Sequence, residues 1–279
     1  MAFVMNGRDD LSMYLSLPLL LIIFLFINGC RCALVPAVIL FGDSTLDATG
    51  TNLLMGANFA SAGSGYDDST ANLYLSLSLN KQLEYYKEFQ AKVVGMVGEA
   101  NASSIFSGGL YVISAGTSDF IQNYYISPVL QITYPTVNQY FDILLRNYEQ
   151  FVENLYSLGA RSIGVTSLPP LGCLPGMITL FGLGKDECVD RLNYDALSFN
   201  RRLNSTSQAL KQRLDDLNLV VLDLYQPLYS IILINPIQNG FLETRKGCCG
   251  TGLFESAMLC NALSIGTCSN ASNYRNVTK

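Results

Sequence analysis

The sequence of 279 residues contains no histidine. Imidazole is the side chain that most readily takes up a proton at physiological pH. Its absence excludes every mechanism in which an imidazole from these residues activates a nucleophile. A base drawn from this chain would have to be a weaker one, such as an aspartate, whose ordinary pKa is about 4.

Charge is also sparse. Charged residues make up 14% of the chain, the formal net charge is −5, and lysine and arginine form no cluster. Because nucleic-acid-binding domains carry a basic patch, we expect no nucleic-acid partner. Hydrophobic residues reach 49%, which is enough for a substantial core, and the length favours one domain.

The apolar run near the N-terminus is too short for a membrane span. It covers residues 17–27, whereas a bilayer requires about 20 residues. A run of this size is typical of the core of a secretory signal peptide. We therefore predict a signal peptide over residues 1–32, cleavage near Ala33, and a mature domain over 33–279. An uncleaved anchor is the alternative.

The chain has no C-x-x-C pair and, lacking histidine, shows no pattern of a zinc site. Six of its eight cysteines follow the predicted signal peptide, and an even number in an exported chain predicts disulfides with 15 possible connectivities. Cys173 and Cys188 flank one loop and are a candidate local pair. The other candidates are Cys248 and Cys249, which we expect to pair with Cys260 and Cys268.

We expect neither a metal nor a cofactor. The glycine-rich runs at 63–65 and 182–184 do not complete the G-x-G-x-x-G pattern after a strand. Four N-x-S/T sequons are candidate glycosylation sites if the chain is exported. They begin at Asn101, Asn204, Asn270 and Asn276.

One strand-and-turn segment stands out. Residues 37–41 (AVILF) form a short apolar run that is typical of a buried strand in a parallel sheet. The run leads directly into Gly42, Asp43 and Ser44, which places a serine hydroxyl at the carboxyl end of a strand. Ligands bind at that edge in open α/β sheets. The alternative role for Ser44 is to cap a following helix.

The rest of the chain alternates between strand and helix patterns. Strands are predicted at 110–115, 162–166 and 219–224. Helices are predicted from Asn80 as a cap, over 135–158 with Pro135 in the first turn, and over 186–218. This alternation predicts an α/β fold whose parallel sheet is covered on both faces.

Six blocks, in this order, resemble the plant secreted branch of the GDSL esterase/lipase family, within the SGNH hydrolase superfamily. They are 41–47 (FGDSTLD), 56–66 (GANFASAGSGY), 81–89 (KQLEYYKEF), 112–120 (VISAGTSDF), 167–175 (SLPPLGCLP) and 246–252 (KGCCGTG). The first block is not the G-x-S-x-G elbow of α/β-hydrolases, because Leu46 replaces the second glycine. The resemblance implies a three-layer α/β/α sandwich with a mostly parallel sheet, SGNH or flavodoxin-like, here incomplete.

The resemblance also implies roles for particular residues. Ser44 matches the nucleophile, and its backbone N–H matches one donor of the oxyanion hole. Ser118 stands where the family usually has asparagine, and its hydroxyl can still donate one hydrogen bond. The other matching motif positions are Gly42, Asp43, Asp47, Gly116 and Asp119.

Two parts of the family pattern have no counterpart in these residues. A second block, whose glycine lends an N–H to the oxyanion hole, is missing after residue 52, and an Asp-x-x-His pair is missing after Tyr274. Loss of one oxyanion donor lowers kcat by about 10²–10³, and loss of the base by about 10⁶ in a well-studied serine protease. Four carboxylates could act as weak bases: Asp43, Asp47, Asp67 and Asp119. Such residues more often cap helices or form turns.

Two functional hypotheses remain. The first is a secreted serine hydrolase that acts without a cofactor on carboxylic esters, either of lipids or of acylated cell-wall components, in the cell wall or apoplast. The second is a catalytically inactive, truncated secreted glycoprotein of the same lineage, or a fragment of a longer gene product. The family blocks favour the first hypothesis, and the missing histidine favours the second.

Overall fold

The computed structural model describes residues 35–43, 53–234, 236–241 and 243–246. Within them, one five-stranded sheet has the spatial order β2-β1-β3-β4-β5, and every neighbouring pair is parallel. The strands are β1 (Val38–Gly42), β2 (Gly56–Asn58), β3 (Leu110–Ser114), β4 (Ser162–Thr166) and β5 (Asn218–Leu222). Their carboxyl ends therefore meet at one edge of the sheet.

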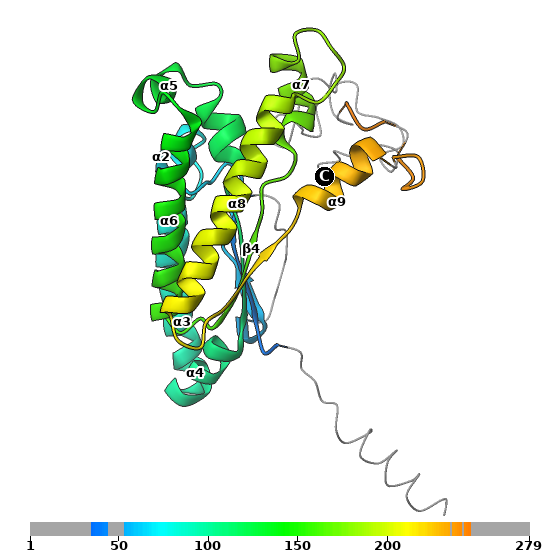
Figure 1. Ribbon diagram of the computed structural model, residues 1–279. Coiled ribbons are helices and arrows are strands. Elements are labelled where there is room, and N and C mark those ends of the chain that lie inside the picture. The colour runs from blue at the N-terminus through cyan, green and yellow to red at the C-terminus, as the bar shows by residue number, and fades with distance from the viewer. Residues whose placement is uncertain (1–34, 44–52, 235, 242, 247–279) are drawn as a thin grey trace, which may run out of the picture. The chain divides into compact units, whose positions relative to one another are not determined.

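Three long helices lie side by side over one face of this sheet, as Figure 1 shows. They are α3 (Leu79–Val97), α6 (Val137–Ser157) and α8 (Asp190–Arg213). The shorter helices are α2 (Asp68–Leu73), α4 (Glu99–Gly108), α5 (Pro128–Thr133), α7 (Pro175–Phe181) and α9 (Tyr225–Tyr229). Single turns are η1 (Leu53–Met55), η2 (Asp119–Tyr124), η3 (Leu171–Cys173) and η4 (Ser230–Ile234), of which η2 and η4 are π-helical.

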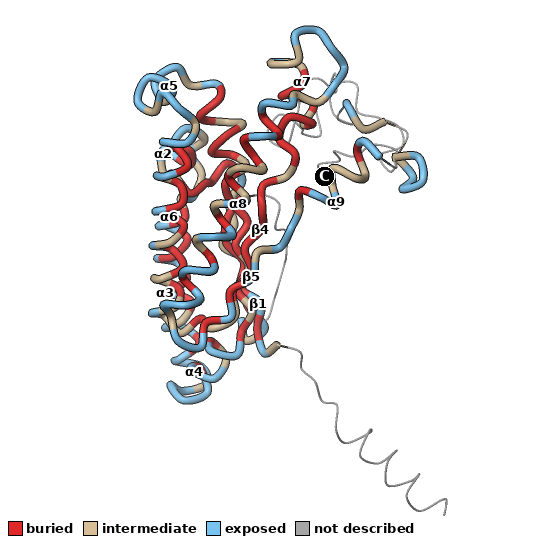
Figure 2. The backbone as a smooth tube through the Cα atoms, in the orientation of Figure 1, coloured by how far each residue is buried: buried red, intermediate tan, exposed pale blue. Residues whose placement is uncertain are grey.

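The hydrophobic core lies between the sheet and the long helices, along the inner positions coloured as buried in Figure 2. Alternate strand residues such as Ile39, Phe41 and Ile113 are fully buried there. The Phe41 ring meets the Phe151 ring of α6 edge to face, with centroids 5.4 Å apart. Each large side chain buried in this way contributes roughly 1.5–3 kcal/mol to folding, so this face is the main source of stability.

The fold prediction is confirmed: the protein is an α/β protein with an all-parallel sheet, consistent with the three-layer α/β/α class. On the face of the sheet opposite the long helices, some apolar strand residues remain exposed among the described residues, for example Val220 and Leu222 of β5. In the described ranges, no helix is both long and apolar enough to cross a membrane. The predicted signal peptide lies outside the described residues.

The first two long helices begin where side chains cap them. Ser78, not Asn80, caps α3 by accepting the N–H of Lys81, whereas the Asn80 amide donates to Asp68. Helix α6 begins with a capping box in which Thr136 and Gln139 each bond the other's backbone N–H. Pro135 therefore precedes the helix, and both predicted starts were wrong by one or two residues.

The third long helix is shorter than predicted at both ends. Residues 186–189 are tied to the η3 loop, because Val189 N–H donates to the Gly172 carbonyl and Cys188 is joined to Cys173. At the other end, Asp216 adopts a left-handed conformation (φ 59°) that turns the chain into β5. Strand β5 itself starts at Asn218 and stops at Leu222, two residues before the predicted end.

The disulfide between Cys173 and Cys188 confirms the predicted local pair. It spans 15 residues and fixes η3 to the segment that leads into α8. Cys173 is fully buried, and the Asn193 amide of α8 donates to its sulfur at 3.4 Å. The other candidate cysteines lie outside the described residues.

We expect that replacing Cys173 and Cys188 together by serine lowers the free energy of unfolding by about 3 kcal/mol, because the bridge closes a loop of this size. Urea titration of both proteins, followed by circular dichroism, measures the change. The wild type in a reducing agent serves as the control and should shift in the same direction. A double variant that unfolds at the wild-type midpoint would contradict this assignment.

Candidate active site

Strand β1 ends in a turn that only glycine can make. Gly42 has φ +120°, and a β-carbon there would lie 1.7 Å from the carbonyl oxygen of Ser114 in β3. The next residue, Asp43, donates its backbone N–H to that same oxygen at 2.8 Å. At the end of β1 the backbone therefore lies in close contact with the carboxyl end of β3. A side chain at position 42 would prevent this contact.

The peptide of Gly42 is also held from its other side. The side chain of Gln82, on α3, accepts the Gly42 N–H through Oε1 at 2.9 Å and donates through Nε2 to the Gly42 carbonyl at 3.0 Å. Ser64 Oγ and Ser61 N–H donate to the same carbonyl oxygen at 2.9 and 2.8 Å. Hydrogen bonds thus fix the backbone immediately before Asp43 on two sides.

The second motif follows the neighbouring strand. Gly42 pairs with Ser114 in the β1–β3 register, so the chain segments after both strands start from adjacent positions. Gly116 has φ +108°, and a β-carbon there would approach Leu168 to 2.9 Å. Ser118 is buried at the N-terminal side of η2. The structure therefore places the described part of the first block, residues 41–43, and the third block at the same edge of the sheet.

Asp119 is a fully buried carboxylate that anchors a loop. It accepts hydrogen bonds from the backbone N–H groups of Tyr66 (2.8 Å) and Asp67 (3.1 Å) and from the hydroxyl of Thr70 (2.7 Å). A β-carbon on Gly65 would lie 2.2 Å from the Asp119 carboxylate, so the loop passes close enough only because that residue is glycine. Both carboxylate oxygens thus act as structural acceptors.

The same loop gives Asp67 a structural role. Its side chain caps α2 by accepting the N–H of Ser69 at 2.9 Å, and Tyr140 donates to its other oxygen at 3.3 Å. Asp43 accepts a long hydrogen bond of 3.5 Å from the hydroxyl of Ser114. Asp67 therefore has the helix-capping contact that aspartates commonly make.

Burial raises the pKa of Asp119 to about 7, with desolvation of the carboxylate as the largest cause. The three hydrogen bonds from Thr70, Tyr66 and Asp67 act in the opposite direction, because they favour the ionised form. The charge of Asp67 raises the pKa slightly further. The balance leaves a carboxyl group that can be protonated in the folded protein near neutral pH.

A second amide side chain holds the end of β4. Asn200 of α8 accepts the backbone N–H of Leu168 at 2.8 Å and donates to the carbonyl of the same residue at 2.9 Å. The sequence analysis assigned no role to this residue or to Gln82, although Gln82 lies within the 81–89 block. A signal was present for Gln82, because it occupies the buried stripe of α3 together with Leu79 and Leu83.

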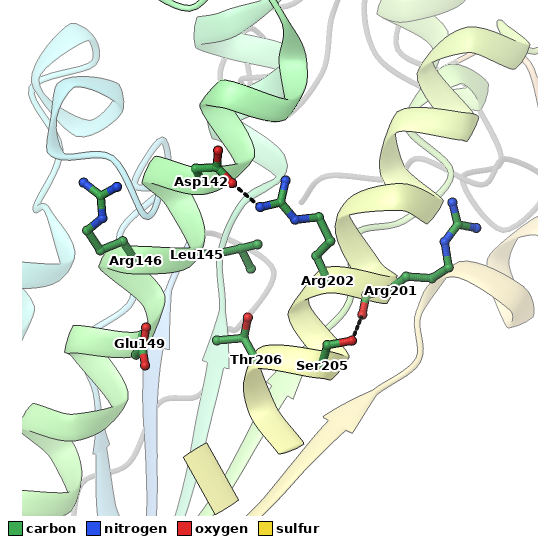
Figure 3. A pocket seen from close by; sticks show the side chains of 8 residues that line it. All are labelled: Asp142, Leu145, Arg146, Glu149, Arg201, Arg202, Ser205 and Thr206. Carbon is green, nitrogen blue, oxygen red and sulfur yellow. Dashed lines mark hydrogen bonds and ion pairs between the residues drawn. The ribbon is translucent and has the colours of Figure 1, made fainter. Parts of the chain in front are cut away.

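Neither of two cavities in the described part of the chain is lined by Gly42, Asp43 or the 116–119 segment. One of about 530 Å³ is a groove between α6 and α8, shown in Figure 3, in which Arg202 pairs with Asp142 while Arg146 and Arg201 point away. The other, of about 240 Å³, lies beside Asp67 and α6. No group of three metal-ligating side chains occurs among the described residues.

Some predicted site residues lie outside the described residues. These are Ser44 and Asp47 of the first block, the sequons at Asn270 and Asn276, and the cysteines Cys248, Cys249, Cys260 and Cys268. Among the described positions, the structure brings Gly42, Asp43, Gly116, Ser118 and Asp119 to one edge of the sheet. Asn101 and Asn204 are exposed on α4 and α8, away from this edge.

Comparison with known proteins identifies the class. A family model described as GDSL-like lipase/acylhydrolase matches residues 38–255, so the chain belongs to this family. Three similar proteins, all from Arabidopsis thaliana, are the GDSL esterase/lipases At5g03810 (57% identical), At3g53100 (54%) and APG (50%). Each alignment covers 82% of this chain and 64% of the relative, so the chain spans less than two thirds of the length of these proteins.

We expect the folded protein to gain stability as the pH falls from about 7 toward about 4. In that window folded Asp119 holds a proton that the unfolded chain has released, so the folded state binds more protons. Urea titrations at several pH values measure the trend, and Asp119→Asn should remove part of the slope. Asp195→Asn is a parallel test, because burial also raises the pKa of Asp195, and it should remove a further part of the slope. An unchanged slope in Asp119→Asn would refute this assignment.

Proposed function

We propose that this chain carries the nucleophile of an ester hydrolase, with Ser44 attacking carboxylic esters. The observation that carries the proposal is the Gly42–Asp43 turn at the carboxyl end of β1, next to the Gly116–Asp119 segment that follows β3. Membership of the GDSL family and the names of the relatives, which are esterase/lipases, support the same chemistry. Lipid esters and acylated cell-wall components are the candidate substrates.

In the proposed reaction the Ser44 oxygen attacks the acyl carbon, and the developing oxyanion needs hydrogen-bond donors. The backbone N–H of Ser44 and the hydroxyl of Ser118 are the donors we assign from this chain. The bond to the ester's alcohol oxygen then breaks, and that oxygen takes up a proton equivalent to the one lost by the serine hydroxyl. Water attacks the acyl-enzyme, releases the acid and returns a proton to the Ser44 oxygen. No cofactor or metal is needed for these steps.

The weak point of this site is the base. No imidazole exists in the 279 residues, and the carboxylates of Asp67 and Asp119 already accept hydrogen bonds from groups within residues 65–70. A serine hydroxyl without a base is a poor nucleophile. This observation favours a second candidate function for a polypeptide of these residues alone: a non-catalytic member of the family.

Export is part of the proposal. A signal peptide over residues 1–32 and a mature hydrolase domain over 33–279 would deliver the protein to the cell wall or apoplast. The exposed positions of Asn101 and Asn204 support glycosylation there, since both sequons lie on helix surfaces that an oligosaccharide could reach. Asn270 and Asn276 are the other two proposed sites.

We predict that a purified polypeptide of these 279 residues hydrolyses a short-chain p-nitrophenyl ester no faster than its Ser44→Ala variant. It lacks an imidazole, and the loss of the base alone lowers kcat by about 10⁶ in a serine hydrolase. Release of p-nitrophenol, corrected for hydrolysis by the buffer, measures the difference.

An extended variant tests the nucleophile itself. It carries a family second block inserted after residue 52 and an Asp-x-x-His segment added after Tyr274, and it should show hydrolysis that Ser44→Ala abolishes. Ser44-dependent turnover at about 1–10³ per second by the 279-residue polypeptide would overturn the inactive alternative. An extended variant that is equally active with alanine at position 44 would overturn the assignment of Ser44.

We also predict that the chain, expressed in a plant secretory host, loses about 32 residues and gains glycans. N-terminal sequencing of the secreted protein locates the cleavage, and enzymatic deglycosylation should reduce its mass. Replacing Asn204 by Gln should remove one glycan and leave the others. Full-length, unglycosylated protein retained in the cytosol would be inconsistent with export.

A further inference from the structure

We infer that Gln82 is a positioning residue for the nucleophile: it fixes the peptide from which the chain enters Asp43 and Ser44. This inference rests on the proposed function of Ser44. Gln82 lies 40 residues further along the chain, on α3, and is fully buried. It bonds both polar groups of Gly42 within 3.0 Å.

A primary amide suits this contact chemically. The side chain of glutamine offers a carbonyl acceptor and an NH₂ donor, uncharged and side by side, and so matches one backbone N–H and one backbone carbonyl. Only one orientation of the amide fits here, because Nε2 also faces the carbonyl of Leu77 at 3.0 Å and the hydroxyl of Ser64 at 3.2 Å. If the amide were flipped, its NH₂ group would face the Gly42 N–H, donor against donor, and its oxygen would face these carbonyls, acceptor against acceptor.

The sheet alone leaves this peptide only partly held. Register pairing between β1 and β2 runs from Val38 to Leu40. Beyond it, Ser61 N–H still donates to the Gly42 carbonyl, and the carbonyl of Ser114 in β3 accepts the N–H of Asp43. The N–H of Gly42 is satisfied instead by Gln82. At φ +120° this glycine has wide backbone freedom, so its direction depends on contacts of this kind.

Rotation about one peptide changes where the following side chains lie. Ser44 is two residues beyond Gly42, and an error of about 1 Å in a reacting group can lower a rate by about 10². Gln82 therefore contributes to the reactivity of Ser44 without touching the substrate. A merely structural glutamine would change stability without changing this reactivity.

The test compares Gln82→Leu and Gln82→Glu with wild type, both in the full 279-residue chain and in the extended variant that carries the second block and the Asp-x-x-His segment. The controls are Gln90→Leu and Gln90→Glu, because Gln90 lies on the same helix and bonds Tyr86 and the Leu158 carbonyl, away from the turn. The probe is an alkyl fluorophosphonate, whose phosphorus bonds to a serine oxygen with loss of fluoride. Peptide mass spectrometry measures the labelling rate of Ser44, and urea titration confirms that each variant is folded.

In the extended variant we expect Gln82→Leu to slow labelling of Ser44 at least about tenfold, and both Gln90 variants to keep the rate of the unsubstituted extended chain. Gln82→Glu should label slowly at about pH 9 and recover toward wild type at about pH 5, because only a protonated carboxyl can donate to the Gly42 carbonyl. Asp43, Tyr66 and Asp119 are the titratable groups beside the turn and the adjoining loop. They are common to all variants, so each rate is divided by the wild-type rate at the same pH.

Backbone amide spectra separate the inference from the proposed function. If Ser44 of the extended variant is labelled no faster than surface serines, the hydrolase proposal fails, and the NMR signals of Gly42 and Asp43 in the 279-residue chain then decide. Positioning of the Gly42 peptide is supported if these two signals shift in the Gln82 variants and not in the Gln90 variants. In Gln82→Glu the shifts should return toward wild type at low pH. Unchanged signals with wild-type labelling in Gln82→Leu would overturn it, and so would equal slowing in Gln90→Leu.

Discussion

The close contact between Gly42 and Ser114 is the constraint on which the proposed site depends. It brings the ends of β1 and β3 so near that a single β-carbon at Gly42 would overlap the Ser114 carbonyl. The peptide so placed receives the Asp43–Ser114 hydrogen bond on one side and the amide of Gln82 on the other. The role that we propose for Ser44 depends on this turn.

A similar device recurs along the same edge of the sheet. Asn200 bonds both polar groups of Leu168 after β4, as Gln82 does at Gly42, the last residue of β1, and each amide comes from a long helix. Asp119 uses its carboxylate in a comparable way for the 65–70 loop. Backbone groups that leave a parallel sheet lose their ladder partners, and buried side chains with matching donors and acceptors supply new ones.

Much of the fold could be predicted from the sequence, because short apolar runs bounded by glycine identify buried parallel strands. Residues 162–166 were predicted with the bounds observed. Strand β2 was missed, since Gly-Ala-Asn has little intrinsic strand preference and its pairing with β1 depends on the tertiary fold. The start of α3 was misplaced because Ser78 and Asn80 are both good caps, and sequence alone does not say which one the helix uses.

The motif residues of the site could likewise be named from the sequence, since Gly42 and Gly116 both follow apolar runs. The contacts that hold them could not. Gln82 and Gly42 are 40 residues apart, and a buried glutamine in an apolar helix stripe shows that a partner exists without showing which. The structural use of Asp119 also required the loop that folds around it.

Native-state hydrogen exchange at the first turn tests the central claim most directly. If the Gly42 peptide is bonded on both sides, the amides of Gly42 and Asp43 should exchange as slowly as those in the middle of β3, because each N–H has a buried acceptor. Exchange of both amides at the rate of an unprotected loop would contradict the claim. The chain would then reach Ser44 from an unfixed strand end.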